Sequence, residues 1–143
     1  MEALESREFP HMTSKNSPAL RVLVVDDEPL IRWSLAQTLA DQGCVVVETE
    51  DAASTRAALT DDFDVVLLDY RLPDSDDLSL LGAIRSRAPR AQVIMMTAFG
   101  APEVVRGALD LGAYRVISKP FDMAAMANLV AQAHADRITR ETN

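Results

Sequence analysis

Five short apolar runs, separated by segments of mixed polarity, dominate the pattern of the chain. They cover about residues 21–25, 44–49, 64–69, 92–97 and 114–118. Runs of this length that are rich in β-branched residues predict strands buried on both faces of a parallel sheet. The chain therefore has the pattern of a sheet whose strands are covered on both sides.

The segments between these runs carry helix signals. Helices are predicted over about residues 28–41, 52–60, 77–87, 102–111 and 122–137. Asp51 is suited to cap the second helix, and Pro102 to begin the fourth. Gly43 and Gly112 follow the first and fourth helices, where glycine commonly ends a helix. The regular alternation predicts an α/β fold with a five-stranded parallel sheet and helices on both faces.

Polar side chains follow the apolar runs at the ends of the predicted strands. Asp26 and Asp27 follow the first run and Asp69 ends the third. In parallel sheets ligands bind beside the carboxyl ends of the strands. Three carboxylates at that edge would repel one another unless a cation joins them, and oxygen ligands without nearby Cys or His favour Mg²⁺.

Asp69 itself is a candidate nucleophile. A carboxylate that follows four apolar residues is costly to desolvate without a partner, and carboxylates beside a metal can form aspartyl-phosphate. Thr97 ends the fourth run, and Lys119 follows the fifth. Their hydroxyl and ammonium groups are suited to bind phosphoryl oxygens at the same edge.

Four segments carry a family resemblance: VLVVDDEP, VVLLDYRLPDSD, VIMMTAFG and LGAYRVISKPFD. Over about residues 20–135 the chain resembles the receiver domain of bacterial two-component response regulators, within the CheY-like superfamily. It is most similar to the NtrC-like receivers of nitrogen regulation. The resemblance implies a (βα)5 doubly wound, flavodoxin-like sandwich with strand order 2-1-3-4-5.

The resemblance also implies a role for each site residue. Asp69 would accept a phosphoryl group, which Thr97 and Lys119 would bind. Mg²⁺ would be held directly by Asp27, mainly through water by Asp26, by Asp69, and by the backbone carbonyl of Arg71. The peptide bond from Lys119 to Pro120 resembles the family's cis bond, since cis bonds are almost confined to X-Pro.

Partners follow from the same resemblance. A sensor histidine kinase would donate the phosphoryl group, and the surface of the fourth helix and fifth strand would then change. This change would control an output domain or a downstream protein, with transcription as the expected output. Homodimerisation on activation is one form that the resemblance allows. The domain would catalyse only its own phosphotransfer and dephosphorylation, and would not be a turnover enzyme.

Two positions depart from the family pattern. Val116 stands where receivers commonly carry an aromatic residue that couples to the threonine, and Asp77 stands where many carry glycine. Tyr114 lies two residues before Val116 and would share its face if the strand included both. Phe99 is expected near the path of the hydrolytic water, which predicts slow dephosphorylation.

Charge and composition narrow the function further. The net charge of −8 argues against direct binding of nucleic acid. No apolar stretch approaches the roughly 20 residues that span a bilayer, and the first residues lack a signal peptide's apolar core. The single Cys44 excludes an internal disulfide and is expected to be a small buried residue. A cytoplasmic protein that binds no membrane is expected.

The domain organisation is expected to be simple. Residues 1–19 are predicted to be a flexible lead-in, residues 20–138 the receiver, and residues 139–143 a C-terminal tail. His11-Met12 resembles a vector junction, which would place the natural start at Met12.

Three other functions are compatible with parts of this pattern. A phosphatase of the haloacid-dehalogenase type needs an Asp two residues after the nucleophile, where this chain has Arg71. A nucleotide or flavin binder would carry a Gly-rich phosphate loop, and none is present. A pseudo-receiver that acts only as an interaction module stays open because of Val116.

Overall fold

The computed structural model describes residues 19–98 and 100–142, with side chains described as far as residue 139. Strands and helices alternate along this part of the chain. The strands are β1 (Arg21–Val25), β2 (Val45–Thr49), β3 (Val65–Asp69), β4 (Gln92–Thr97) and β5 (Arg115–Ser118). The helices are α1 (Pro29–Asp41), α2 (Ala52–Ala58), α3 (Ser79–Arg87), α4 (Pro102–Asp110) and α5 (Met123–Thr142). The predicted α/β alternation is confirmed.

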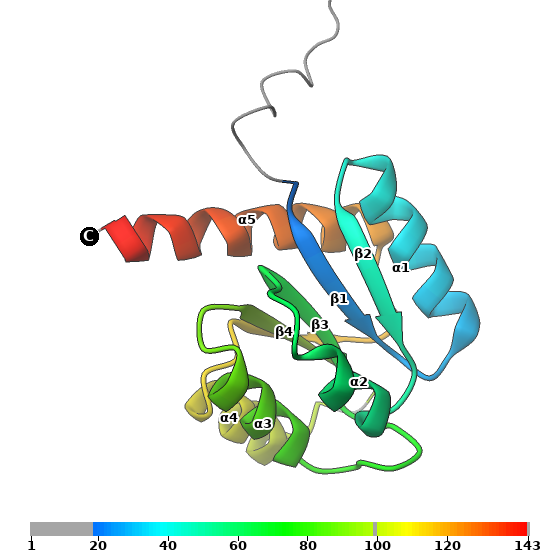
Figure 1. Ribbon diagram of the computed structural model, residues 1–143. Helices are drawn as coiled ribbons and strands as arrows, with labels where there is room; N and C mark the ends of the chain where they lie inside the picture. Colours follow the sequence, from blue (N-terminus) through cyan, green and yellow to red (C-terminus); the bar gives the residue numbers. More distant parts are fainter. Residues whose placement is uncertain (1–18, 99, 143) are drawn as a thin grey trace, which may run out of the picture.

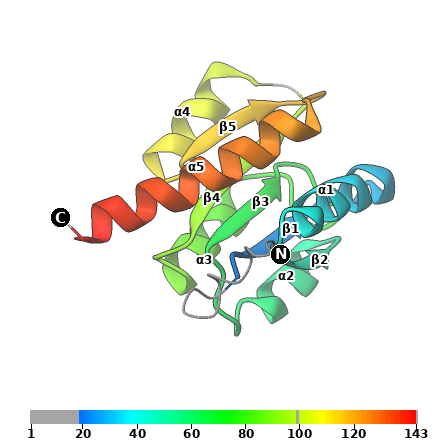
Figure 2. The ribbon, with the colours of Figure 1, turned by 90° about the horizontal axis from the view of Figure 1, so that it is seen from above.

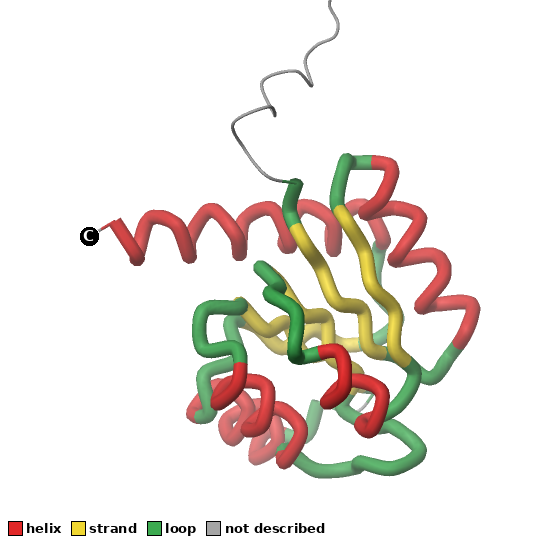
Figure 3. The backbone as a smooth tube through the Cα atoms, in the orientation of Figure 1, coloured by secondary structure: helices red, strands yellow, loops and turns green. Residues whose placement is uncertain are grey.

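All strand pairs are parallel, and the order in the sheet is β2-β1-β3-β4-β5. Figure 2 labels the strands in this order, and Figure 3 draws the strands in yellow. The predicted order 2-1-3-4-5 is therefore confirmed. β3 and β4 lie inside the sheet and are buried along their whole length. β2 and β5 lie at the edges and are partly exposed. The continuous apolar runs of β3 and β4 agree with burial on both faces of the sheet.

Helices cover both faces of the sheet. α1 and α5 lie on one face, and α2, α3 and α4 lie on the other (Figures 1 and 2). Alternate residues of β1 face the two layers, as side chains of a strand must. Val22 and Val24 pack toward α1 and α5, whereas Leu23 and Val25 pack toward the other three helices. The core is thus two apolar clusters, one on each side of the sheet.

The ends of several elements carry the signals that the sequence predicts. Asp51 caps α2 by accepting a hydrogen bond from Ser54 N at 2.8 Å. α4 begins at Pro102. Gly43 and Gly112 follow α1 and α4 and have φ angles of 91° and 101°, which favour glycine.

Three helices differ from their predicted bounds by two residues or more. α3 begins at Ser79, two residues later than predicted, because the Asp77 carboxylate accepts a hydrogen bond from Ser79 N at 2.9 Å and precedes the helix. α5 continues to Thr142, five residues past the predicted end and into the predicted tail. Residues 138–142 contain neither Gly nor Pro, so nothing in the sequence stops the helix. α2 ends at Ala58, two residues early.

The predicted lead-in, residues 1–19, lies outside the described residues except for residue 19. Among the helices of the described part of the chain, none is long and apolar enough to cross a membrane.

The two glycines with positive φ provide a matched pair of variants. A Cβ at Gly43 would meet no atom within 4 Å, whereas a Cβ at Gly112 would lie 2.8 Å from Arg85 Nε. We expect Gly43→Ala to lower the free energy of unfolding by roughly 1–2 kcal/mol through backbone strain alone. Gly112→Ala should cost more, because Arg85 Nη1 is hydrogen-bonded to the Ala91 carbonyl at 2.7 Å and must move.

Urea denaturation of the two variants measures this difference. Equal losses of stability would show that Arg85 yields without cost and would contradict the expected contribution of the close approach.

Candidate functional site

The ends of β3, β4 and β5 bring three of the predicted site residues together. Asp69 pairs with Met96 in the sheet, so Thr97 lies at the next position along the neighbouring strand. Thr97 in turn pairs with Ser118, and Lys119 N donates a hydrogen bond to the Thr97 carbonyl at 2.8 Å. The bond between Lys119 and Pro120 is cis, as predicted. The register of the sheet thus places the Asp69 carboxylate, the Thr97 hydroxyl and the Lys119 ammonium at neighbouring strand ends, in that order across the sheet.

Asp26 reaches the same edge from β1. Its backbone N–H donates to the Thr49 carbonyl at 3.1 Å, which continues the ladder with β2 by one residue. Its side chain is fully buried, and Oδ1 accepts a hydrogen bond from Glu28 N at 2.9 Å. This bond turns the chain sharply after Asp26 and carries Glu28 back toward the pocket.

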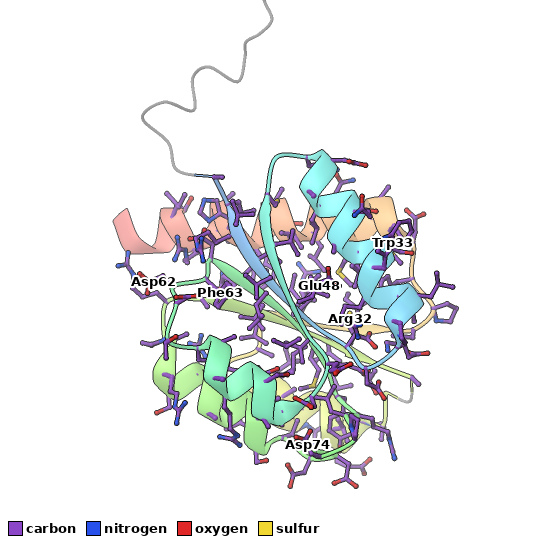
Figure 4. All side chains as sticks on the ribbon, turned by 45° about the vertical axis from the view of Figure 1, so that its right-hand side comes forward. Arg32, Trp33, Glu48, Asp62, Phe63 and Asp74 are labelled. Atoms are coloured by element: carbon purple, nitrogen blue, oxygen red, sulfur yellow. The ribbon has the colours of Figure 1, made fainter. Side chains whose placement is uncertain are left out.

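Arg32 of α1 supports this turn, a role that the sequence did not indicate. Its Nη1 atom donates to the Asp26 carbonyl at 2.7 Å, and its Nε lies 3.3 Å from Oε1 of Glu48. Figure 4 labels Arg32 and Glu48 where α1 faces β2. The ion pair orients the guanidinium, and the guanidinium holds the backbone that presents the Asp26 carboxylate.

The ammonium of Lys119 lies among three carboxylates. Its Nζ atom is 2.8 Å from Glu28 Oε1, 3.0 Å from Asp26 Oδ2 and 3.2 Å from Asp69 Oδ2. Asp26 and Asp69 are both buried, whereas the Glu28 side chain is half-exposed. Sequence analysis predicted the lysine and the two aspartates at this edge, but it did not predict Glu28.

Burial and the neighbouring charges shift the pKa values of Asp69 and Lys119. Burial and the nearby Asp26 charge raise the pKa of Asp69 to about 7, against the opposing effect of Lys119 and of the Arg71 backbone N–H. Burial disfavours the Lys119 ammonium, but hydrogen bonds to Glu28 and Asp26 and the carboxylate charges raise its pKa above the usual value. Lys119 is therefore charged throughout the physiological range, and Asp69 titrates near neutrality.

The carboxylates are arranged so that a small cation fits. Oxygen atoms of Asp26, Glu28 and Asp69 lie within 4.8 Å of one another. Asp26 Oδ2 is buried and accepts no well-aligned hydrogen bond, although Lys119 Nζ is close to it. An all-oxygen donor set of this kind suits Mg²⁺ rather than Zn²⁺. The residues present therefore fit the metal that the sequence predicted.

Asp27 and Arg71, the other two predicted metal ligands, line the same pocket. The lining also includes Glu28, Asp69, Thr97, Ala98 and Lys119. The Asp27 side chain is exposed and does not belong to the group of three carboxylates that approach one another. Glu28 is the third member of that group instead of Asp27. The only feature of the sequence that could have indicated Glu28 is its position two residues after Asp26.

Val116, which departs from the family pattern, and Tyr114 pack against opposite faces of the sheet. Val116 is partly buried and packs against the cluster beneath α2, α3 and α4. Tyr114 packs against the opposite cluster, and its hydroxyl donates a hydrogen bond to Asp136 of α5. The expectation that the two share a face is wrong, because β5 begins only at Arg115 and strand alternation does not extend back to Tyr114. Phe99 lies outside the described residues.

Comparison with known families gives one match over most of the chain. The model of the response regulator receiver domain matches residues 22–131. The match contains every residue of the pocket at the carboxyl edge of the sheet.

Individual relatives agree with this match. The chain is 38% identical to the response regulator protein PilR of Pseudomonas aeruginosa, over 79% of this chain and 26% of PilR. It is 39% identical to the DNA-binding transcriptional regulator NtrC of Escherichia coli, over 78% of this chain and 24% of NtrC. It thus spans about a quarter of the length of these curated relatives.

A solved structure gives the same fold. The CheY-like receiver domain protein of Methanospirillum hungatei superimposes with a TM-score of 0.82 at 26% identity. The alignment covers 85% of this chain and 98% of that one.

The raised pKa of Asp69 predicts a pH-dependent gain in stability when its charge is removed. The folded state binds the Asp69 proton more tightly than the unfolded state does, so the ionised carboxylate destabilises the metal-free fold increasingly as pH rises from about 4 to 7. In EDTA, Asp69→Asn should raise the free energy of unfolding at pH 8 by at least about 1 kcal/mol. The gain should disappear at pH 4.

Urea denaturation across this pH range measures the effect, with Asp27→Asn as the control. Asp27 is exposed, so its variant should show no comparable gain. A gain for Asp69→Asn that is the same at pH 4 and pH 8 would contradict the electrostatic explanation.

Proposed function

Because this chain belongs to the response regulator receiver family, we propose that it is a phosphorylation-dependent signalling switch whose acceptor is Asp69. The observation that carries the proposal is the buried Asp69 carboxylate at a strand end, 3.2 Å from the Lys119 ammonium. Thr97 follows in the neighbouring strand, and Asp26 Oδ2 lies 3.0 Å from the same ammonium. A sensor histidine kinase is the proposed phosphoryl donor.

The transfer step conserves atoms and charge within this pocket. An Asp69 carboxylate oxygen attacks the phosphorus of a phosphohistidine, a P–O bond forms, and the P–N bond breaks. The electron pair of that bond remains on the imidazole nitrogen. Lys119 then leaves Glu28 for a phosphoryl oxygen, and the Thr97 hydroxyl donates a hydrogen bond to another. Glu28 is the partner best placed to release the ammonium, because its side chain is half-exposed.

Asp26, Asp27, Asp69 and the Arg71 backbone carbonyl are the proposed ligands of Mg²⁺, and Glu28 is near enough to assist them. When bound, the metal neutralises the oxygens of the incoming phosphoryl group. Asp69 must be ionised to attack, so the cation and Lys119 together oppose the burial that favours its protonated form. Water would later hydrolyse the acyl phosphate, with no turnover of an external substrate.

The proposed output is a change at the surface of α4 and β5, which follow Thr97 and precede Lys119 along the chain. One named relative is a DNA-binding transcriptional regulator. We therefore propose a transcriptional output through a module that the receiver contacts, with homodimerisation as one form of the activated state. A cytoplasmic location agrees with a phosphoryl donor of the two-component type.

A pseudo-receiver is the second candidate function, and Val116 is the observation that favours it. Val116 lacks the aromatic ring that receivers commonly move when the threonine binds the phosphoryl group. In that case the pocket would still accept a phosphoryl group or its mimic, but the α4–β5 surface would not respond. Amide hydrogen exchange between residues 100 and 116, with and without beryllofluoride, distinguishes the two functions.

Phosphorylation should occur on Asp69 alone. Incubation with acetyl phosphate and Mg²⁺ should add one phosphoryl group that is stable in acid and labile in base. Intact-mass and peptide mass spectrometry locate it, and Asp69→Asn should abolish it. Phosphorylation that persists in Asp69→Asn, or that maps to another residue, would refute the assignment.

Mg²⁺ should stabilise the fold through the acidic residues of the pocket. At 100 times its dissociation constant, a ligand that binds only the folded state adds about 2.7 kcal/mol. Asp27→Ala should abolish the resulting rise in melting temperature, measured by differential scanning calorimetry. Asp41→Ala is the control, since Asp41 is also exposed but lies at the far end of α1. A rise that survives in Asp27→Ala would remove Asp27 from the ligand set.

A further inference from the structure

The loop between β3 and α3, residues 70–78, begins directly after the proposed acceptor Asp69 and carries Arg71. We call it the acceptor loop. Two features fix its middle. The Leu72 side chain is buried in the core, and Leu72 and Ser75 exchange two backbone hydrogen bonds of 2.8 and 3.2 Å. These bonds close a tight turn with Pro73 and Asp74 at its tip. The position of the tip therefore affects how the neighbouring Arg71 backbone is presented to the pocket.

Asp74 attaches this tip to the start of α2 (Figure 4). Its Oδ1 atom accepts a hydrogen bond from Ala52 N at 2.7 Å, and its Oδ2 atom accepts one from Ala53 N at 3.1 Å. The third N–H of the helix, that of Ser54, is bound by Asp51 at 2.8 Å. The carboxylates of Asp74 and Asp51 thus together accept hydrogen bonds from the first three N–H groups of α2, which have no partner within the helix.

The two carboxylates differ in what they connect. Asp51 belongs to the helix it caps, so its contact is local. Asp74 is 22 residues away from Ala52 in the sequence, so its contact joins the acceptor loop to a separate element. Because both of its oxygens bind consecutive N–H groups, the contact fixes the direction of the carboxylate as well as its distance. Charge favours it further, since a helix start attracts anions.

We propose that Asp74 is a positioning residue for the phosphorylation site: by holding the loop tip on α2, it keeps the Arg71 backbone turned toward the metal pocket. The inference rests on the proposed function, in which the Arg71 carbonyl is a ligand of Mg²⁺. It adds that the start of α2 and the metal site are coupled. Such coupling acts in both directions, so Mg²⁺ must also affect the Asp74 contact.

The test compares three variants with the wild-type chain by titration with MgCl₂ in a calorimeter. Asp74→Ala should weaken Mg²⁺ binding by about tenfold, the lower end of the effect of removing a group that orients a metal ligand. Asp74→Asn keeps an oxygen acceptor and should weaken binding less. Asp51→Ala removes a cap from the same helix without touching the loop, and should change the affinity by less than about twofold.

A second readout follows the amides themselves. In ¹H–¹⁵N spectra, Mg²⁺ should shift the Ala52 and Ala53 signals of the wild-type chain, and Asp74→Ala should remove these shifts. The Ser54 amide, which Asp51 holds, is the internal control and should shift less. The free energy of unfolding of each variant shows whether the proteins compared are folded.

The outcomes separate the inference from the function on which it rests. Equal Mg²⁺ affinity in wild type and Asp74→Ala, or equal weakening in Asp74→Ala and Asp51→Ala, overturns the positioning role alone. A wild-type chain that binds no Mg²⁺ overturns the proposed metal site together with the inference. Selective weakening in Asp74→Ala, with partial retention in Asp74→Asn, supports both.

Discussion

The site depends on one electrostatic constraint, which is that three carboxylates surround a single ammonium. Oxygen atoms of Asp26, Glu28 and Asp69 lie within 4.8 Å of one another, and Lys119 Nζ is 3.2 Å or less from all three. Two unit charges about 4 Å apart near a protein surface interact by about 4 kcal/mol. The ammonium balances only one of the three negative charges. The raised pKa of Asp69 is one response to this deficit, and binding of a divalent cation is the other.

The sheet makes this arrangement possible because it restricts how far the charged groups can separate. Asp69 is the last residue of β3 and pairs with β4, and the Asp26 N–H is bonded to the Thr49 carbonyl. Neither backbone can withdraw without breaking the sheet's hydrogen bonds. Glu28 and Arg71 lie in loops and are free of this restriction. One half of the pocket is therefore made by strand ends, which the hydrogen bonds of the sheet fix. The other half is made by two loops, which are held by other contacts, among them Glu28 N to Asp26 and Ala52 N to Asp74.

The division between strands and loops also explains what the sequence could predict. The strands, and the positions of Asp69, Thr97 and Lys119 at their ends, were predictable from continuous apolar runs whose carboxyl ends meet at one edge of a parallel sheet. The strand order was predicted from the family resemblance. Glu28 was missed because an exposed loop residue has no pattern, and its approach depends on the hydrogen bond from its N–H to Asp26. The face of the sheet on which Tyr114 packs was predicted wrongly, because Tyr114 lies just before β5 and strand alternation does not apply to it.

Contacts between loop residues and distant elements left no signal in the sequence. The bond of Asp74 to α2 leaves no local signal, since Asp51 already satisfies the requirement for a cap. The same is true of Leu78, whose Cδ1 atom would lie 2.9 Å from a Cβ at Gly107. A side chain at Gly107 would displace Leu78, so the small residue on α4 is explained by a contact with the end of the acceptor loop.

The short length of α2 explains why two carboxylates, those of Asp51 and Asp74, bind the N–H groups at its start. α2 has seven residues, and isolated helices shorter than about 12 residues are marginal in water. Its start must therefore be fixed by contacts from elsewhere in the fold. The acceptor loop also needs an anchor, because its tip at Pro73 and Asp74 is exposed. A carboxylate on the loop meets both needs at once: the helix gains acceptors for two N–H groups, and the loop gains a directional attachment that apolar packing alone does not provide.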